Sequence, residues 1–277
     1  MPELPEVEVI RRDLERDTVG KRIKEVDVKL PRIIRRHKTK KEFTDALAGA
    51  KIQRIDRRGK YLLLYLDTGQ VPVMHLGMSG RVERTTGRKV PEKHTHVVIK
   101  LQSGGDLRFI DMRQFGEMFV TPADDLGMVK ELQHIAIDPL ADSFTWQVFS
   151  EIVASRKLKL KTLLMDQKFI SGIGNIYSDE ILWAAGLRHD RSSDSLTSQE
   201  VRRLYRAMQE VLQEGIRHGG VTLDDETYRN LYGKTGEFQQ HLKAYGQEGK
   251  PCRRCRTPIV RERWGNRSTY YCPQCQV

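Results

Sequence analysis

The chain has 277 residues, of which 48 are lysine or arginine and 37 are aspartate or glutamate, so its formal net charge is +11. This length allows two domains with separate cores, and the basic excess favours a polyanionic partner, nucleic acid before a membrane surface, over a merely soluble basic protein. The N-terminus is acidic and lacks the apolar core of a secretory signal, and the longest apolar run, near residues 61–66, is too short to span a bilayer. We therefore expect a cytoplasmic protein with no membrane partner.

The chain begins Met1-Pro2-Glu3-Leu4-Pro5-Glu6, which contains a potential nucleophile. Removal of Met1 would expose the imino nitrogen of Pro2, a secondary amine whose pKa of about 8 leaves part of it unprotonated at neutral pH. Such an amine attacks an electrophilic sugar carbon and leaves an iminium, and the carboxylates of Glu3 and Glu6 could manage the protons of glycosidic bond cleavage. The alternative, and the commoner use of such residues, is a capped helix with an apolar stripe. That stripe would consist of Val7, Ile10 and Leu14.

Short segments with strand character follow the first helix. They lie at residues 22–30, 50–56, 61–66, 71–76, 96–101, 106–110 and 117–120. Because no helical pattern separates them, they predict an antiparallel β-sandwich that carries the N-terminal helix.

The pattern becomes helical beyond Pro122, with Ser143 and Ser198 as expected helix caps. The helical segments are predicted at residues 123–131, 143–155, 158–166, 176–185 and 198–217. The chain is therefore expected to be of the α+β class, with a domain boundary between about residues 122 and 140.

Several loops of the predicted sandwich display side chains suited to nucleic acid. Lys60 stands at a strand start, where it could contact a phosphate or a lesion, although a solvated turn lysine is the commoner case. Met78 lies in a glycine-flanked loop after His75, and Arg113 and Phe115 lie in a second loop. Met and Phe can unstack bases and Arg can hydrogen-bond an unpaired base, so these residues, with His75, are candidate DNA contacts. Taken singly, each is more often a core residue.

The segment Gly172-Ile173-Gly174-Asn175 precedes a predicted helix. Its glycines allow a close approach of the backbone to a polyanion, Asn175 is expected to cap the helix, and exposed N–H groups at a helix start bind phosphate. The preceding segment is basic and includes Lys161, a further candidate DNA contact. An ordinary turn in a helical bundle is the structural alternative.

The four cysteines all lie in the last 26 residues. They form two Cys-x-x-Cys pairs sixteen residues apart: Cys252, Cys255, Cys272 and Cys275. This spacing predicts a tetrahedral site for one structural Zn²⁺, whose closed coordination leaves no position for water; a pair of redox-active motifs is the alternative. Arginines between the pairs, Arg267 among them, would lie on a β-hairpin and be available to a DNA backbone.

Taken together, these motifs resemble the bacterial formamidopyrimidine-DNA glycosylase (MutM) family over essentially the whole chain. The N-terminal Met-Pro-Glu-Leu-Pro-Glu, the loop residues, the Gly-Ile-Gly-Asn-Ile-Tyr segment at residues 172–177 and the four-cysteine ribbon occur in that family's order. The resemblance implies a catalytic domain at residues 1–130, a helix-two-turn-helix domain with a lesion-capping loop at residues 131–237, and a zinc ribbon at residues 238–277.

The resemblance also implies an enzyme of base excision repair, a bifunctional glycosylase and lyase. Pro2 would attack C1′ and expel an oxidised purine such as 8-oxoguanine or a formamidopyrimidine, Glu3 would transfer protons, Glu6 would assist, and β,δ-elimination would nick the strand. The implied substrate is double-stranded DNA containing oxidised purines, and family habit implies a monomer. The implied DNA contacts divide into phosphate contacts, which are Lys60, Asn175 and Arg267, and residues that fill the vacated stack, which are Met78, Arg113 and Phe115.

Two other functions stay open. The endonuclease VIII-like enzymes are similar in their catalytic start and zinc ribbon but prefer oxidised pyrimidines, whereas Leu4 and the Arg113-Gln114-Phe115 loop resemble the purine-specific branch. A non-catalytic zinc-ribbon DNA-binding protein would explain the charge and the cysteines, but not Pro2 and Glu3. The chain departs from the family at Arg256, where glycine is usual after the second cysteine and a positive φ is expected.

Overall fold

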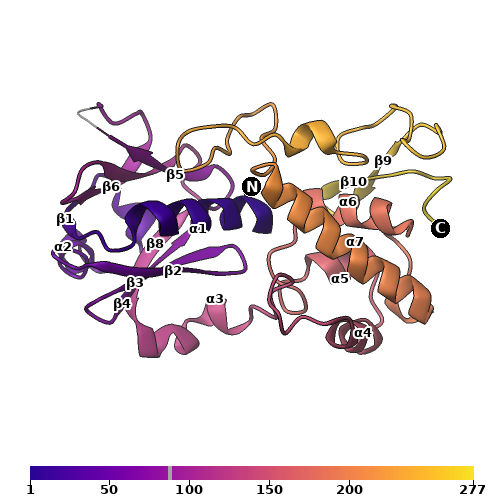
Figure 1. Cartoon of the computed structure of the whole chain (residues 1–277), viewed down its shortest axis with the longest axis horizontal. Coiled ribbons are helices and arrows are strands. Elements are labelled where there is room, and N and C mark those ends of the chain that lie inside the picture. Colours follow the sequence, from indigo (N-terminus) through magenta and orange to yellow (C-terminus); the bar gives the residue numbers. More distant parts are fainter. Residues whose placement is uncertain (87–88) are drawn as a thin grey trace. The chain divides into compact units, whose positions relative to one another are not determined.

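The computed structural model describes residues 1–86 and 89–277, which form two compact units (Figure 1). Unit 1 comprises Met1–Gln133 and His218–Glu237, and unit 2 comprises His134–Arg217 and Phe238–Val277. Among the described residues, no helix is both long enough and apolar enough to cross a lipid bilayer.

Unit 1 contains one long helix and two four-stranded antiparallel sheets. The helices are α1 (Leu4–Thr18), α2 (Lys40–Asp45) and α3 (Lys130–Gln133), with 3-10 turns η1 (Pro31–Ile34) and η2 (Ala123–Met128). One sheet has the order β1 (Ile23–Val28), β6 (Thr95–Leu101), β7 (Asp106–Asp111) and β5 (Gly80–Thr85). The other has the order β2 (Ile52–Arg58), β3 (Tyr61–Leu66), β4 (Gln70–His75) and β8 (Glu117–Pro122).

The two sheets and α1 share one hydrophobic core, which confirms the predicted helix and antiparallel β-sandwich. Val7, Ile10 and Leu14 are fully buried in this core, as the apolar stripe of α1 predicts. The core includes side chains from both sheets, such as Ile99 of β6 and Leu64 of β3. Val7, Ile10 and Leu14 are therefore core residues of an ordinary amphipathic helix, as the alternative interpretation of this segment predicts. That interpretation does not account for Pro2, Glu3 and Glu6.

Within residues 1–86 and 89–133, the sandwich has eight strands, one more than the sequence pattern indicates. The additional strand β5 has the sequence GRVERT, in which Arg81 and Glu83 are joined by an ion pair of 2.6 Å. Its charged residues resemble a solvated loop, but pairing with β7 satisfies its backbone groups.

Unit 2 contains the remaining helices and a β-hairpin. The helices are α4 (Trp146–Ala154), α5 (Leu160–Met165), α6 (Asn175–Ala185) and α7 (Ser198–Arg217), with 3-10 turns η3 (Ser193–Ser195) and η4 (Phe238–His241); the hairpin consists of β9 (Val260–Trp264) and β10 (Arg267–Tyr271). Two expected caps differ from the structure. Thr145, not Ser143, caps α4, and Thr197, not Ser198, accepts the N–H of Glu200 at the start of α7.

Residues 218–237 belong to unit 1, which differs from the expected domain bounds of 131–237. The physical reason is burial, because Tyr228 and Leu231 enter the core of the sandwich and the Arg84 N–H donates to the Leu231 carbonyl at 2.7 Å. The side chain of Arg16 on α1 also donates to the Tyr232 hydroxyl at 2.7 Å. The chain thus leaves unit 1 after α3 and returns to it after α7.

A buried ion-pair cluster fixes α1 on β2. Glu8 accepts hydrogen bonds from Arg11, Arg12 and Arg57, and the Arg57 side chain also donates to the Gly59 carbonyl at 3.0 Å. Burial alone would raise the pKa of Glu8, but the hydrogen bonds and charges of these arginines outweigh it and lower that pKa to about 2.

We predict that Glu8→Gln lowers the free energy of unfolding in a pH-dependent manner. The pKa of Glu8 is depressed in the folded state, so its stabilisation is complete above the unfolded-state pKa of about 4.5 and is lost as pH falls toward 2. The stability difference between wild type and Glu8→Gln should be about 3 kcal/mol at pH 7 and should narrow by about 1 kcal/mol at pH 3.5.

Urea unfolding at a series of pH values measures this difference. Glu15→Gln, which removes an exposed carboxylate of the same helix, is the matched control and should cost less than about 0.5 kcal/mol at every pH. A difference in unfolding free energy between wild type and Glu8→Gln that stays constant between pH 7 and pH 3.5 would contradict the prediction.

Candidate active site, DNA interface and metal centre

The start of α1 places two carboxylates in a buried position directly after Pro2. Glu3 is the N-cap residue and Glu6 lies in the first helical turn, with exposed fractions of 3% and 2%. The Glu6 carboxylate accepts the Glu3 backbone N–H at 2.8 Å, which is half of a capping box. Pro2 is buried as well, whereas Met1 is 45% exposed. The structure thus brings together the three residues that the sequence proposes for the chemistry.

The second oxygen of Glu6 binds the returning segment of unit 1. It accepts the N–H of Val221 at 2.8 Å, so one carboxylate joins the first residues of the chain to residues more than 200 positions later. Gly220 has a φ of +84°, and a Cβ there would lie 2.8 Å from the Glu6 side chain and 3.0 Å from the ring of Tyr228. Glycine is therefore required at this position. Sequence reasoning placed a lesion-capping loop within the domain at residues 131–237 but did not connect that loop to Glu6.

Lys60 lies in the tight turn between β2 and β3, next to Gly59 with a φ of +56°. Arg57 connects this turn to α1 through its bonds to Glu8 and to the Gly59 carbonyl. His75, which ends β4, is opposite Tyr61 in the sheet, and their rings are 4.5 Å apart. Burial lowers the pKa of His75 to about 4, and Lys60 acts in the same direction although Glu117 opposes it. His75 is therefore uncharged at neutral pH.

The loops that hold Met78 and the pair Arg113 and Phe115 are in direct contact. A Cβ on Gly77 would lie 2.6 Å from the backbone nitrogen of Gly116, so only glycine allows this approach. Met78 and Phe115 are 40% and 50% exposed, unusual for large apolar side chains, and the Arg113 guanidinium lies 5.3 Å from the Phe115 ring centroid. In the β2-β3-β4-β8 sheet, His75 is opposite both Tyr61 and Glu117. The Lys60 turn precedes Tyr61, the Met78 loop follows His75 and the Phe115 loop precedes Glu117, so all three lie at the same end of this sheet.

A fully buried carboxylate, that of Asp111, organises these loops. One of its oxygens accepts the hydroxyl of Ser79 at 2.6 Å and the N–H of Arg113 at 3.2 Å, and the other accepts the N–H of Gly116 at 2.7 Å. Sequence reasoning did not assign Asp111 a role. The signal that could have found it is an acidic residue at a strand end inside a glycine-rich loop, a position where a carboxylate often accepts backbone N–H groups.

In unit 2, Asn175 is the first residue of α6 and not its cap, which is Gly174. Its amide nitrogen donates to the Ser268 carbonyl at 3.0 Å, and its Oδ1 is buried with no hydrogen-bond partner in the described part of the chain. The expectation for Lys161 is corrected. Lys161 is completely buried and pairs with Asp179 at 2.6 Å, so it is not placed to contact a DNA backbone. Burial raises the pKa of Asp179, and the Lys161 charge opposes that rise.

Arg267 begins β10 and is exposed, with its guanidinium 3.9 Å from the sulfur of Met165 on α5. The hairpin register pairs Arg267 with Trp264, whereas Arg263 pairs with Ser268. Because neighbouring residues of a strand face opposite sides, Arg267 lies on the face opposite Arg263. Arg267 therefore shares its face with Thr269, which hydrogen-bonds to Asp179 of α6.

The four cysteines form one cluster in which the sulfurs all lie within 4.8 Å of one another. The Cys252–Cys275 and Cys255–Cys272 sulfur distances are 4.0 and 3.5 Å, which bracket the separation of about 3.8 Å expected when four thiolates surround Zn²⁺ tetrahedrally. Backbone N–H groups of Arg254 and Cys275 point to the sulfurs of Cys252 and Cys272. The ribbon therefore fits one structural zinc ion. Arg256 has a φ of +69°, so the strain expected from the missing glycine is present.

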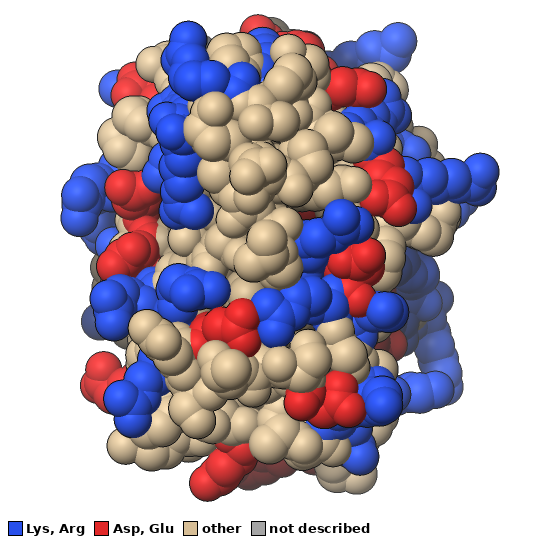
Figure 2. Space-filling model, turned by 90° about the vertical axis from the view of Figure 1, so that its right-hand side faces the viewer, with Lys and Arg blue, Asp and Glu red and all other residues tan. Residues whose placement is uncertain are grey.

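Charge is distributed over the surface. Figure 2 shows one face of the molecule, on which basic and acidic side chains are interspersed around areas without charged residues, and a row of both charges crosses the lower half of the view. The distribution of charge therefore does not locate a DNA-binding site on this face.

Comparison with known proteins matches each part of the chain to the same family. Residues 1–118 match the formamidopyrimidine-DNA glycosylase N-terminal domain, residues 135–227 match the helix-two-turn-helix (H2TH) domain of that enzyme, and residues 249–277 match the zinc finger found in Fpg and isoleucyl-tRNA synthetase. The formamidopyrimidine-DNA glycosylase of Pelotomaculum thermopropionicum is 43% identical over 276 residues, covering 100% of this chain and 99% of that one.

Solved structures of proteins with this family name superimpose on almost the whole chain. The MutM (Fpg) protein of Thermus thermophilus superimposes with a TM-score of 0.89 at 38% identity, covering 99% of this chain and 98% of that one. The Lactococcus lactis Fpg in complex with abasic-site DNA superimposes with a TM-score of 0.90 at 32% identity, covering 99% of each chain. The chain is thus a DNA glycosylase of base excision repair. It belongs to the formamidopyrimidine-DNA glycosylase family, as the sequence resemblance predicted.

We predict that Asp111→Asn weakens binding to a duplex that contains a stable abasic-site analogue by about tenfold or more. Either orientation of the new amide would point an N–H₂ group at N–H or O–H donors that Asp111 now accepts, so the loops of Met78 and Phe115 would lose their fixed arrangement. Fluorescence anisotropy with a labelled duplex measures the affinity.

The matched control is Asp67→Asn, which alters another turn carboxylate that accepts a backbone N–H, that of Lys51, but lies away from these loops. This control should bind the duplex as wild type does. Wild-type affinity of Asp111→Asn in a folded protein would show that Asp111 does not hold the loops in their binding arrangement.

Proposed function

We propose that this chain excises oxidised purines from double-stranded DNA by using the imino nitrogen of Pro2, freed when Met1 is removed, as its nucleophile. The observation that carries the proposal is the buried arrangement at the start of α1, where Glu3 and Glu6 follow Pro2 and Glu6 is held by two backbone N–H groups. A mutant of the Lactococcus lactis Fpg has been solved in complex with DNA containing Fapy-dG, and a MutM protein has been solved with DNA containing carbocyclic 8-oxo-G; both complexes support this substrate class.

The proposed reaction begins when the Pro2 nitrogen attacks C1′ of the damaged nucleotide. The bond from C1′ to the base breaks, the base leaves with the electron pair, and a proton neutralises it. Glu3 gives a proton to the sugar ring oxygen as the ring opens, and the product is an iminium between Pro2 and C1′. The iminium acidifies C2′, so loss of a C2′ proton expels the 3′ phosphate, and a second elimination expels the 5′ phosphate. Hydrolysis of the iminium then frees Pro2.

Glu6 is proposed to act as a positioning residue. Its two oxygens hold the Glu3 backbone and the Val221 backbone, so it aligns the acid and the returning segment without taking part in proton transfer. This role explains why a carboxylate is tolerated in a buried site that would otherwise penalise its charge.

The proposed DNA contacts divide by chemistry. Lys60, Asn175 and Arg267 are proposed to bind phosphates. The side-chain amide of Asn175 is held by one hydrogen bond, from its nitrogen to the Ser268 carbonyl, because its Oδ1 has no partner in the described residues. Met78, Arg113 and Phe115 are proposed to fill the space vacated by the extruded nucleotide, with Arg113 hydrogen-bonding the orphan cytosine. Extrusion costs a few kcal/mol, and their exposed apolar and cationic surface offsets that cost. His75, being neutral, is proposed to contact DNA only as a hydrogen-bonding group.

The enzyme is further proposed to act as a monomer in the cytoplasm. Its substrate is DNA, and each proposed catalytic or DNA-contacting residue is supplied by one copy of the chain. Light scattering coupled to size-exclusion chromatography, with and without a 20-base-pair duplex, would report the mass of the protein and of its complex.

The lesion assay tests the proposed substrate. Single-turnover strand cleavage is measured on matched duplexes carrying 8-oxoguanine opposite cytosine, an oxidised pyrimidine opposite its normal partner, or no lesion. We expect the 8-oxoguanine duplex to be cleaved fastest, and Glu3→Gln to lower that rate by about 10²–10⁴-fold while leaving duplex affinity similar. Faster cleavage of the oxidised pyrimidine would assign the chain to endonuclease VIII-like specificity instead.

A further inference from the structure

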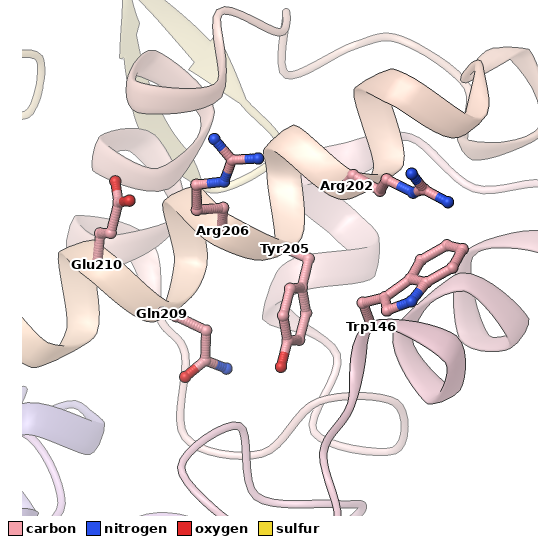
Figure 3. Close-up of a pocket in the computed structure, with 6 residues that line it drawn as sticks. All are labelled: Trp146, Arg202, Tyr205, Arg206, Gln209 and Glu210. Carbon is pink, nitrogen blue, oxygen red and sulfur yellow. The ribbon is translucent and has the colours of Figure 1, made fainter.

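A pocket of ≈ 480 Å³ lies between α4 and α7 in unit 2 (Figure 3). Its lining residues are Trp146 at the start of α4 and, from α7, Arg202, Tyr205, Arg206, Gln209 and Glu210. None of them is among the proposed catalytic residues, DNA contacts or zinc ligands. The pocket is therefore unexplained by the glycosylase reaction.

The floor of the pocket is fixed by packing and hydrogen bonds. The Tyr205 hydroxyl donates to the Phe144 carbonyl at 2.8 Å, and its ring packs against Phe144 and Phe149 with centroid distances of 5.7 and 6.0 Å. The Gln209 amide donates to the Pro139 carbonyl at 2.7 Å. A ligand would meet a preformed surface, which lowers the entropic cost of binding.

The pocket carries cationic groups without internal counter-ions. In the described part of the chain, neither Arg202 nor Arg206 has a carboxylate within 4.0 Å, whereas the nearby Arg191 pairs with Glu200 at 2.6 Å. The Arg202 guanidinium lies 4.5 Å from the centroid of the Trp146 ring. Figure 3 shows these two side chains next to each other at one end of the pocket. The pocket thus offers two guanidinium groups beside apolar aromatic surface, with the single carboxylate of Glu210 among its lining residues.

We propose that this pocket binds an acidic peptide segment of a partner protein, one that presents carboxylates beside a large apolar side chain. The carboxylates pair with Arg202 and Arg206, since guanidinium groups accept carboxylate geometry well. The apolar side chain packs on Trp146 and Tyr205, and Glu210 accepts a backbone N–H of the peptide.

A nucleic acid strand fits the pocket less well. The Arg202 guanidinium already covers one face of Trp146, where a base would have to stack. Glu210 would repel a phosphate that followed the groove along α7. An acidic peptide can place its carboxylates at Arg202, at the end of the pocket away from Glu210, and its apolar side chain mainly on Tyr205 (Figure 3).

The test uses full-length protein and a fluorescein-labelled probe peptide of sequence Asp-Asp-Glu-Leu-Phe. Fluorescence anisotropy should give a Kd of roughly 10–100 μM, the range expected for a short peptide in one small pocket. Arg202→Glu and Arg206→Glu should each weaken binding by about tenfold or more. Arg217→Glu, the same charge change on an exposed arginine of α7 that does not line the pocket, is the matched control and should change the Kd by less than about twofold.

Two further probe peptides separate the contribution of the carboxylates to binding from that of the apolar side chains. The peptide Asn-Asn-Gln-Leu-Phe, without carboxylates, and Asp-Asp-Glu-Ala-Ala, without the apolar side chains, should each bind at least about fivefold more weakly. All three variants should cleave an 8-oxoguanine duplex at the wild-type rate, which shows that they are folded and separates this inference from the proposed function.

Three results would overturn the proposal. The first is absence of peptide binding at 1 mM. The second is an equal change in the peptide Kd for Arg206→Glu and Arg217→Glu. The third is that Arg206→Glu loses binding of a single-stranded oligonucleotide but keeps peptide binding. The last result would assign the pocket to nucleic acid.

Discussion

The bidentate use of the Glu6 carboxylate is the interaction on which the proposed active site depends. One oxygen accepts the N–H of Glu3 and the other accepts the N–H of Val221, so a single side chain joins the first residues of the chain to the segment that returns from unit 2. A buried carboxylate is costly unless both of its oxygens are hydrogen-bonded, and here the two backbone groups meet that need. Gly220 is required because any side chain there would occupy the space of Glu6. Loss of this carboxylate would leave two buried N–H groups unsatisfied and would release the acid at position 3.

Buried carboxylates hold irregular backbone in place at two other positions. Asp111 accepts two backbone N–H groups and one hydroxyl in the loops of Met78 and Phe115. Glu180, buried in α6, accepts the N–H groups of Lys243, Ala244 and Tyr245 on the approach to the zinc ribbon, and its burial raises its pKa. Regular strands satisfy their own backbone groups, but the segments that carry function do not, and buried acids supply the missing acceptors.

Much of the fold and the chemistry could be predicted from local sequence patterns. Alternation and helical periodicity identified seven of the eight sandwich strands in the described residues, and the main helices, because each pattern reflects burial on one face. Strand β5 was missed because Arg81 and Glu83 make it resemble a solvated loop. Long-range pairing was not predictable: no spacing shows that Lys161 is buried against Asp179, that Glu6 binds Val221, or that residues 218–237 return to unit 1. The zinc ligands were predictable because all four lie in two short motifs, whose geometry is set locally.

The claim that the Pro2 nitrogen is the nucleophile is tested most directly by borohydride trapping. The protein is incubated with a duplex that carries one 8-oxoguanine opposite cytosine, the iminium is reduced, and the covalent product is digested and mapped by mass. We expect a cross-link on the N-terminal peptide at Pro2 that disappears when Met1 is retained. A cross-link at a lysine such as Lys60, or one that persists with Met1 in place, would contradict it.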